Sequence, residues 1–199
     1  MLGSEIAMPL AMLIAGYLLG SIPFGLIVTR LGGAGDLRAI GSGNIGTTNV
    51  LRTGRKELAA VTLLLDMGKG AAAVLLARAF APECVALAAA AAFFGHLYPV
   101  WLRFRGGKAV AILLGIALAI DWRIGIAAAL AWLAAALITR FSSVGGMVSA
   151  VAAPIAAAAI GRYDLAALFL AMAVMVLWKH RGNIERLVAG TEPRIGKTA

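Results

Sequence analysis

Charge, cysteine and histidine are all scarce in this sequence of 199 residues. Only 14% of the residues are charged, and the single cysteine, Cys84, excludes a scaffold held together by disulfides. The two histidines, His96 and His180, stand far apart in the chain. No His or Cys spacing typical of a metal site is therefore present, and we expect no bound metal.

Apolar residues, in contrast, make up 62% of the chain, and the mean hydropathy is +0.94. Soluble domains contain roughly 45–50% apolar residues, so a soluble globule of this size has too little interior for these side chains. The same content excludes a disordered chain. The sequence therefore predicts an all-α, polytopic membrane protein that forms one helical bundle and one domain over residues 1–199. A chain of this length holds at most seven or so membrane-spanning helices of about 20 residues each.

Seven apolar stretches, separated by short polar segments, are candidates for these helices: 6–29, 58–77, 84–102, 109–120, 124–139, 141–161 and 165–178. The first is expected to be a retained helix rather than a signal peptide, because no positive charge precedes it. The stretches 109–120, 124–139 and 165–178 are short for a crossing. They require flanking Lys, Arg or Trp side chains that reach the headgroups, or a locally thinner bilayer. A re-entrant hairpin made of 109–120 and 124–139 remains an alternative.

Basic residues outnumber acidic residues by 18 to 9, which gives a net charge of +9. In a soluble protein this excess would indicate a nucleic-acid partner. Seven alternating crossings, however, place 14 basic residues on one side and three on the other, with one more inside the second span. By the positive-inside rule this predicts an N-terminus outside the cell and a C-terminus in the cytoplasm. Because membrane orientation explains the charge, we expect no nucleic-acid partner.

Glycines and short polar side chains are concentrated in segment 36–52, on the predicted cytoplasmic side. Glycines let successive backbone N–H groups point into one concavity, and hydroxyl and amide side chains add donors. This pattern favours an anion-binding loop, with a flexible solvent loop as the alternative. The residues that form this pattern are Gly41, Ser42, Gly43, Asn44, Gly46, Thr47, Thr48 and Asn49. The match of 41–46 to GxGxxG is treated as accidental, because no strand and helix of a parallel sheet surround it.

A second segment, 95–108, places Gly106 and Gly107 next to Lys108 at the predicted start of a helix. Backbone donors, the helix dipole and a cation converge there, which is typical of a phosphate site. A Walker A loop is excluded, because Ala109 stands where that motif has Ser or Thr. ATP is therefore not expected as a substrate.

Several charged residues near these segments have two interpretations each. Arg103 and Arg105 either bind a phosphate or anchor the chain to lipid headgroups. His96, near the cytoplasmic end of a predicted span, is either catalytic or makes one structural hydrogen bond. Asp66 and Lys69 stand three residues apart inside the second span. Unpaired charges are expensive there, so we expect an ion pair that holds helices together rather than a proton relay.

The third polar segment, 180–192, follows the last predicted span. If that helix continues, His180 and Asn183 are three residues apart and share one face, with Leu187 below them. The alternative is a capped, solvated helix end.

Three motifs occur in order along the chain: Asp36-Leu-Arg-x-x-Gly-Ser-Gly-Asn-x-Gly-x-Thr-Asn-x-x-Arg52, then Gly95-His96-x-x-Pro99 with Phe104-x-Gly106-Gly107-Lys108, then His180-x-x-Asn183-Ile-x-Arg186-Leu-x-x-Gly190-x-Glu192. Together with Leu65-Asp66-x-x-Lys69-Gly70, this set resembles the bacterial acyl-phosphate:glycerol-3-phosphate acyltransferases over the whole chain. One departure is Ala109, because that family usually has glycine after the lysine. Alanine prefers helix, so we expect it to bring the start of the following helix forward and to alter the loop slightly.

The resemblance implies transfer of a fatty acyl group from acyl phosphate to the sn-1 hydroxyl of glycerol 3-phosphate. The products are 1-acylglycerol 3-phosphate (lysophosphatidate) and phosphate, in the first step of phospholipid synthesis. It places the enzyme in the bacterial inner membrane, among membrane lipids, with an active site that faces the cytoplasm, no cofactor and no obligate protein partner. The alternative from another class is a small transporter of an anionic metabolite, although transporters place their sites near the bilayer midplane.

The resemblance also assigns roles within an active site formed by segments 36–52, 95–108 and 180–192. The acyl phosphate is held by Gly41, Ser42, Gly43 and Asn44, and Gly106 and Gly107 form a phosphate loop. The residues expected to hold glycerol 3-phosphate and neutralise charge in the transition state are Arg52, Lys108, His180 and Asn183, which with Ser42 complete the catalytic set. The general base is either the donor's own phosphate, which the resemblance favours, or His180. Glu192 is expected to be structural, paired with a neighbouring arginine.

Overall fold

The computed structural model of the chain describes residues 2–41 and 43–196, with side chains from residue 6 onward. Within these ranges every regular element is helical. The chain divides into two compact units, Met1–Ile120 and Asp121–Ala199. The all-α architecture expected from the sequence is therefore confirmed, and each unit is described by itself.

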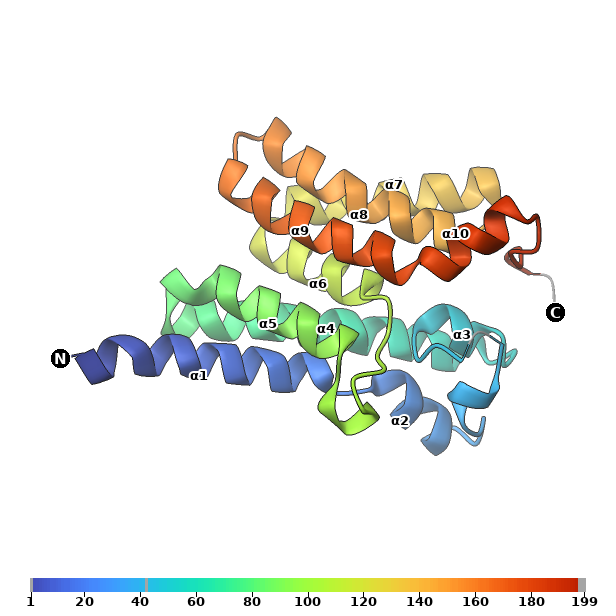
Figure 1. Cartoon of the computed structure of the whole chain (residues 1–199), viewed down its shortest axis with the longest axis horizontal. Coiled ribbons are helices and arrows are strands. Elements are labelled where there is room, and N and C mark those ends of the chain that lie inside the picture. Colours follow the sequence, from blue (N-terminus) through green and yellow to red (C-terminus); the bar gives the residue numbers. More distant parts are fainter. Residues whose placement is uncertain (1, 42, 197–199) are drawn as a thin grey trace. The chain divides into compact units, whose positions relative to one another are not determined.

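The first unit is built around α4 (Lys56–Phe80), which packs against α1 (Leu2–Ser21), α5 (Val85–Leu97) and α6 (Val110–Ile120). Helices α1 and α5 also pack against each other, and Figure 1 shows them beside α4. The shorter elements are α2 (Phe24–Leu31), α3 (Thr47–Leu51) and the 3-10 turns Leu37–Ala39, Pro82–Cys84 and Val100–Leu102. Two long connections, between α2 and α4 and between α5 and α6, carry the first two motifs.

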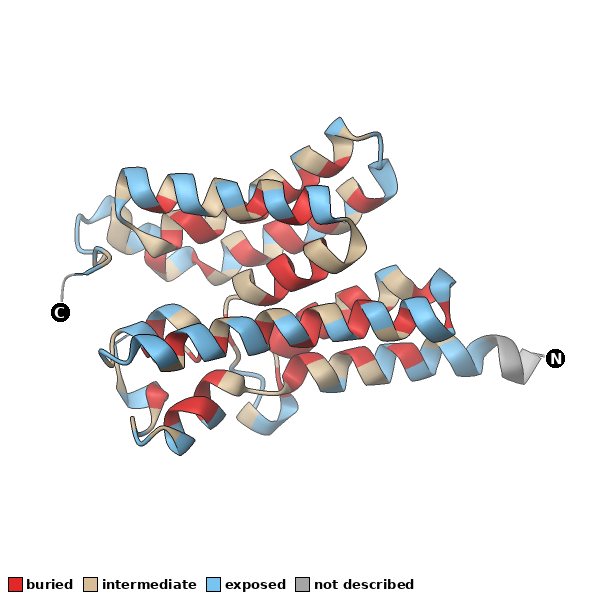
Figure 2. Cartoon of the chain, turned by 180° about the vertical axis from the view of Figure 1, so that it is seen from behind, coloured by how far each residue is buried: buried red, intermediate tan, exposed pale blue. Residues whose placement is uncertain are grey.

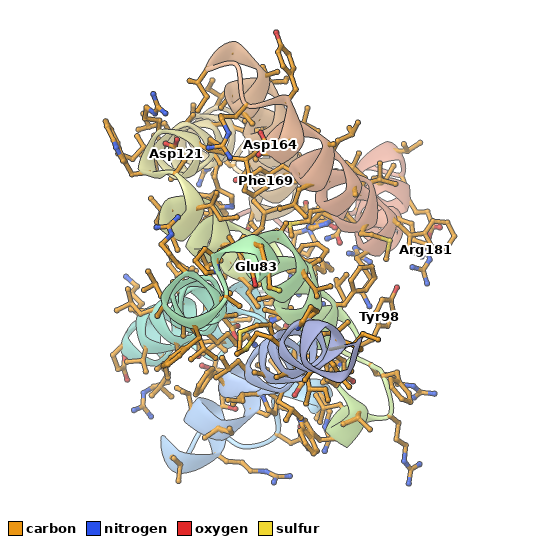
Figure 3. All side chains as sticks on the ribbon, turned by 90° about the vertical axis from the view of Figure 1, so that its left-hand side faces the viewer. Glu83, Tyr98, Asp121, Asp164, Phe169 and Arg181 are labelled. Carbon is orange, nitrogen blue, oxygen red and sulfur yellow. The ribbon has the colours of Figure 1, made fainter. Side chains whose placement is uncertain are left out.

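The second unit consists of α7 (Trp122–Thr139), α8 (Ser142–Ala159), α9 (Tyr163–Lys179) and α10 (Arg181–Val188). Helix α8 packs against both α7 and α9. Phe169, which is labelled in Figure 3 and belongs to α9, is fully buried. The third motif begins where α9 ends.

The helices agree with the seven apolar stretches expected from the sequence, except that two stretches are interrupted. In the third stretch, 84–102, α5 ends at Leu97, and only the 3-10 turn Val100–Leu102 follows. The first stretch contains a break between α1 and α2 at Ile22 and Pro23, because proline has no N–H to continue the helical hydrogen bonds. Five helical segments of the described residues are long and apolar enough to cross a membrane, or six if the bent pair α9 and α10 counts as one. Helix α6 has only 11 residues. The number of crossings therefore stays a prediction, as does the re-entrant alternative.

Many large apolar side chains on the long helices face outward. Leu64 of α4 is 67% exposed and Leu170 of α9 is 57% exposed. Figure 2 shows exposed residues alternating with buried ones along the helices. Exposed apolar surface of this kind is unfavourable in water and favourable against lipid tails, so the helices suit a hydrocarbon environment.

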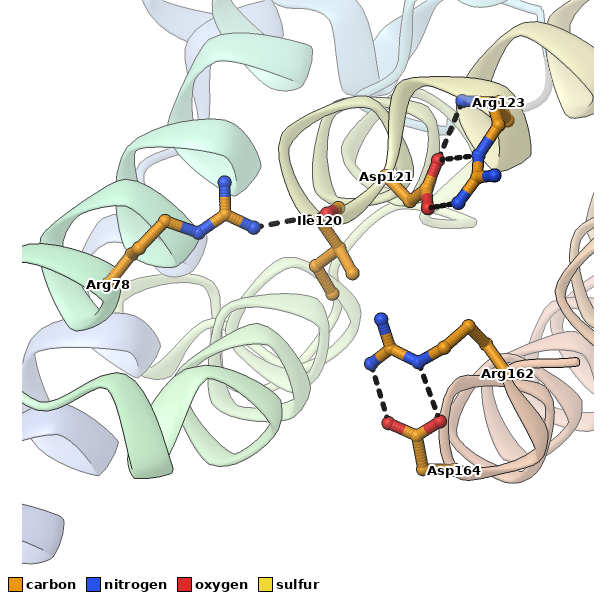
Figure 4. A network of polar contacts seen from close by, with 6 residues as sticks. All are labelled: Arg78, Ile120, Asp121, Arg123, Arg162 and Asp164. Carbon is orange, nitrogen blue, oxygen red and sulfur yellow. Dashed lines mark hydrogen bonds and ion pairs between the residues drawn. The ribbon is translucent and has the colours of Figure 1, made fainter. Parts of the chain in front are cut away.

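Arginines near three helix ends are satisfied by groups close to them (Figure 4). The guanidinium group of Arg123 lies 2.8 Å from the carboxylate of Asp121, and that of Arg162 lies 2.7 Å from that of Asp164. Arg78 donates to the carbonyl oxygen of Ile120 over 3.0 Å. These are the three arginines that the sequence places opposite the basic face. Two of them, Arg123 and Arg162, are neutralised by acidic residues two positions away.

Candidate active site

Asn49 holds the loop of the first motif in shape. Its side-chain amide donates to the carbonyl oxygens of Leu37, over 2.9 Å, and of Ile40, over 2.8 Å, and the residue is only 2% exposed. At the start of the loop, Asp36 accepts hydrogen bonds from the backbone and side chain of Arg38. These bonds hold the pKa of the Asp36 carboxyl well below its usual range, so Asp36 is ionised and acts as a cap. The sequence placed Asn49 among the anion donors, whereas its amide is used within the loop.

The glycines of this loop adopt conformations that other residues avoid. Gly41 has φ +53° and Gly43 has φ +66°, both in the left-handed region. A Cβ atom on Gly41 would also stand 2.8 Å from Nη1 of Arg52, so the two residues are in close contact. Asn44 turns inward, and its side-chain oxygen accepts from the backbone N–H of Gly46 over 3.0 Å. Ser42, the remaining predicted donor ligand, lies outside the described residues.

The second motif folds back onto the end of α5. The backbone N–H of Gly107 donates to the carbonyl oxygen of His96 over 3.0 Å, and that of Gly106 donates to Leu97 over 3.1 Å. A Cβ atom on Gly107 would overlap the imidazole Nε2 of His96. Glycine is therefore required because the loop lies directly on the histidine. The partly buried Lys108 follows this contact immediately.

Ala109 does not bring the next helix forward, contrary to the expectation from its helix propensity. It has φ +63°, in the left-handed region, and α6 begins only at Val110. The position needs a left-handed backbone, which glycine adopts without strain and alanine adopts at a cost of roughly 1–2 kcal/mol. Tertiary structure thus overrides the preference of alanine for helix, because the loop that precedes it is fixed on His96.

Arginines from the first two motifs meet at a cavity of about 340 Å³ in the first unit. Arg38 comes from the first loop, and Arg103 and Arg105 come from the second, with Trp101 and Leu102 completing the lining. The indole N–H of Trp101 donates to the hydroxyl of Ser21 over 2.8 Å, which fixes one wall. The two loops are therefore neighbours, and their shared surface is strongly basic.

The third motif begins at a bend of 55° between α9 and α10, so the helical path continues past α9 only in a new direction. His180 occupies the bend and is 3% exposed. Its Nδ1 lies 2.8 Å from the carbonyl oxygen of Val176. Since a carbonyl only accepts, Nδ1 carries a hydrogen, and in the neutral form of the ring the lone pair is therefore on Nε2.

Glu192 connects two helices of the second unit, α8 and α10. Its carboxylate accepts from the hydroxyl of Ser143 and the amide of Asn183, each over 2.6 Å, and pairs with Arg186 at 2.8 Å. Burial acts to raise the pKa of the Glu192 carboxyl, but the three hydrogen bonds outweigh burial, and the pKa lies below the usual glutamate value. The expected pairing of Glu192 with an arginine is confirmed. The structure adds that Glu192 orients the Asn183 amide.

We expect Glu192→Gln to destabilise the protein at neutral pH and to reduce the sensitivity of its stability to acid. A charge-assisted hydrogen bond contributes roughly 1.5–3 kcal/mol. Because the folded-state pKa is lowered, this stabilisation is fully present above the unfolded-state pKa of about 4.3 and is lost as pH falls through the folded-state value. Thermal unfolding in detergent between pH 7 and pH 3.5 measures the effect. Exposed Glu185 on α10 supplies the control, Glu185→Gln. Parallel pH responses of Glu192→Gln and the unaltered protein would contradict this account.

The structure brings some of the predicted site residues together within each unit. In the first unit Gly41 lies against Arg52, and Gly106 and Gly107 lie against the end of α5. In the second unit, residues 180–192 form one cluster with α8 through Glu192. The buried Asp66 and Lys69 form the expected ion pair, with 2.8 Å between Oδ1 and Nζ. In the described ranges, no group of three or more His, Cys, Asp or Glu residues is arranged to hold a metal ion.

Comparisons of the sequence with known proteins agree with this arrangement of motifs. Residues 10–190 match the family described as glycerol-3-phosphate acyltransferase. The glycerol-3-phosphate acyltransferase of Zymomonas mobilis is 56% identical over 196 residues, which covers 91% of this chain and 92% of the relative. That of Caulobacter vibrioides is 58% identical over 189 residues, which covers 93% and 87%.

Two solved structures resemble the fold. Both are crystal structures of PlsY, described as an integral membrane glycerol 3-phosphate acyltransferase. The glycerol 3-phosphate form matches with a TM-score of 0.89 and 34% identity, and it covers 94% of this chain and 96% of that chain. The lysophosphatidic acid form matches with a TM-score of 0.87 and 32% identity. Sequence, fold and motif order thus agree, and the chain belongs to the glycerol-3-phosphate acyltransferase family.

Proposed function

We propose that this integral membrane glycerol-3-phosphate acyltransferase takes its acyl group from an acyl phosphate and transfers it to the sn-1 hydroxyl of glycerol 3-phosphate. The observation that carries the proposal is the match to PlsY along nearly the whole chain, in forms with glycerol 3-phosphate and with lysophosphatidic acid. These two molecules are the acceptor and the product of the proposed reaction. The basic, glycine-rich loops of the first unit suit substrates that both carry a phosphate.

The proposed chemistry needs no protein nucleophile. The sn-1 oxygen attacks the carbonyl carbon of the acyl phosphate, a new C–O ester bond forms, and the bond from that carbon to the phosphate oxygen breaks. The electron pair of the broken bond leaves with inorganic phosphate. The hydroxyl proton passes to a phosphate oxygen of the donor, which serves as the base. Orientation of the two substrates then supplies much of the acceleration.

The donor phosphate is assigned to the first loop, to Gly41, Ser42, Gly43 and Asn44. Left-handed glycines at 41 and 43 support this assignment, because such a backbone can present N–H groups to an anion. The buried Asn49 amide keeps the loop in that shape without a bound ligand. Such preorganisation is what transition-state stabilisation requires, since the donors need no rearrangement during the reaction.

The acceptor is assigned to Arg52, Lys108, His180 and Asn183, with Gly106 and Gly107 shaping the loop before the lysine. The active site in this proposal combines segments 36–52, 95–108 and 180–192 within one functional domain. Two cations suit a doubly charged phosphate, and the Asn183 amide oriented by Glu192 suits a glycerol hydroxyl. No cofactor, metal or protein partner is needed for this chemistry.

We further propose that all three segments face the cytoplasm at a bacterial inner membrane, with the N-terminus outside. The uneven distribution of basic residues and the local neutralisation of Arg123 and Arg162 support this orientation. Cysteines introduced into 31–57, 103–108 and 182–199 should react with an impermeant reagent only from the cytoplasmic side. In a Cys84→Ser background, the introduced thiol of Glu83→Cys should react only from outside. Labelling of 31–57 and 182–199 from opposite sides would exclude both this topology and a shared active site.

The donor is tested directly with purified protein in lipid. We expect phosphate release and lysophosphatidate formation with acyl phosphate and glycerol 3-phosphate. We expect no product with acyl-CoA, because the proposed loop binds the phosphate next to the reacting carbonyl, and a thioester has a sulfur there instead. The His-x-x-x-x-Asp pattern of acyl-CoA-dependent enzymes is also missing, since Trp101 stands five residues after His96. Activity should persist in EDTA and without ATP. Comparable turnover with acyl-CoA, or a requirement for ATP or a divalent metal, would overturn the proposal.

A further inference from the structure

Helix α4 contains a buried ion pair, and burying two charges is unfavourable unless other groups in the protein contact them. Asp66 and Lys69 are 3% and 2% exposed at their side chains, inside a helix that is apolar enough to cross the membrane. Two charges removed from water lose their solvation, and their mutual attraction offsets that loss only with good geometry and further hydrogen bonds. The further contacts of the pair show which parts of the first unit it connects.

Lys69 reaches the break in the first apolar segment. Its Nζ donates to the carbonyl oxygen of Ile22 over 2.8 Å, and it stands 5.8 Å from the ring centroid of Phe24. The break removes helical hydrogen bonds from the backbone around Pro23. The carbonyl of Ile22 also accepts from the backbone N–H of Phe24 over 3.1 Å, so Lys69 is its second donor within the protein. Lys69 therefore stabilises the bend from which α2 and the first motif follow.

Asp66 faces the second motif. Its Oδ1, which binds Lys69, lies 3.7 Å from Nδ1 of His96, a residue only 4% exposed. His96 in turn supports the glycine loop in two ways. Its backbone carbonyl accepts from Gly107 over 3.0 Å, and its imidazole fills the space where residue 107 would carry a Cβ.

We propose that Asp66, Lys69 and His96 are positioning residues. They hold the loop 106–108, and with it Lys108, at a fixed position relative to the first motif. The three side chains form a continuous buried path from the break at Ile22 to Gly107. They touch no substrate in this scheme and act through Lys108. The inference rests on the proposed function, because it assumes that Lys108 binds the acceptor phosphate.

The first test is a double-mutant cycle between His96→Ala and Lys108→Ala, read as the KM for each substrate. We expect His96→Ala alone to raise the KM for glycerol 3-phosphate on the order of tenfold or more, as small displacements of a positioned group do, while the KM for acyl phosphate stays constant. In the Lys108→Ala background, His96→Ala should add less than twofold. A full, independent effect in both backgrounds would refute the inference.

The cycle separates the inference from the proposed function. If Lys108→Ala leaves the KM for glycerol 3-phosphate unchanged, then the assignment of the acceptor site is wrong. If Lys108→Ala raises it but His96→Ala acts additively, then only the positioning role is wrong. Thr62→Val supplies the control, because Thr62 is a fully buried polar residue one turn before Asp66 on the same helix and outside the path.

A second test uses the close contact between Gly107 and His96. Gly107→Ala should raise the KM for glycerol 3-phosphate, since its methyl group displaces the loop from the imidazole. Adding His96→Ala removes the overlapping ring, so the double variant should bind glycerol 3-phosphate better than Gly107→Ala alone. A double variant worse than both single variants would contradict the proposed contact. Asp66→Asn with Lys69→Met tests the path without leaving a lone buried charge, and should shift the same KM.

Discussion

The substitutions Arg52→Ala and Lys108→Ala are each expected to raise the KM for glycerol 3-phosphate and to lower kcat. Together these changes should reduce kcat/KM on the order of tenfold to a hundredfold. Each substitution removes a cation assigned to a doubly charged phosphate. Loss of one charge-assisted hydrogen bond is worth roughly 1.5–3 kcal/mol, and every 1.4 kcal/mol or so corresponds to a factor of ten. Steady-state kinetics with both substrates varied separates the effect on the acceptor from any effect on the donor.

Arg55 offers a matched control for Arg52. It follows α3 in the same connection, carries the same charge, pairs with Glu57 and donates to the carbonyl of Gly32 over 3.1 Å. Because these contacts lie outside the assigned site, Arg55→Ala should change kcat/KM less than twofold. Arg52→Lys should be more active than Arg52→Ala and less active than the unaltered protein, because lysine keeps the charge but cannot bind a phosphate in the bidentate manner of a guanidinium group. Unaltered kinetics in Arg52→Ala and Lys108→Ala would place the acceptor site elsewhere.

The helices could be predicted from the sequence because the chain is unusually apolar and its polar residues are grouped. Each of the seven stretches contains helix, and α4 begins and ends within three residues of the expected 58–77. The seven stretches contain no break at Ile22 or at Tyr98, although Pro23 and Pro99 are visible signals for one. Prolines also occur inside α1 and α8 without breaking them, at Pro9 and Pro154, so proline alone does not identify a break.

The residues of the candidate site could be predicted from their motifs, whereas the contacts between them could not. Glycines at 41, 43, 106 and 107 were recognised as loop formers, and two of them have the left-handed backbone that only glycine adopts easily. The role of His96 as the surface beneath Gly107 could not be read from the sequence, because it depends on how a loop folds back on α5. Ala109 failed as a helix start for the same reason: its conformation is set by the loop before it.

His180→Gln distinguishes the two candidates for the general base. Glutamine can donate or accept a hydrogen bond but cannot take up a proton near neutral pH. A protein general base typically contributes a factor of about 10²–10⁴ to the rate. We expect kcat to fall by less than about a hundredfold, because the donor's phosphate accepts the proton and His180 only helps to hold the acceptor.

The pH profile of the same variant gives an independent measurement. If the donor's phosphate is the base, the profile of kcat should keep its shape, since no ionisation near the ordinary imidazole pKa of about 6.5 is lost. Near-ultraviolet circular dichroism and binding of both substrates confirm that the variant is folded, which matters because His180 is buried and hydrogen-bonded to Val176. Val176→Ala preserves that backbone carbonyl and shortens its side chain, so it controls for packing at the bend. If turnover of His180→Gln vanishes while both substrates still bind, then Nε2 of His180 takes the hydroxyl proton and the substrate-assisted mechanism is wrong.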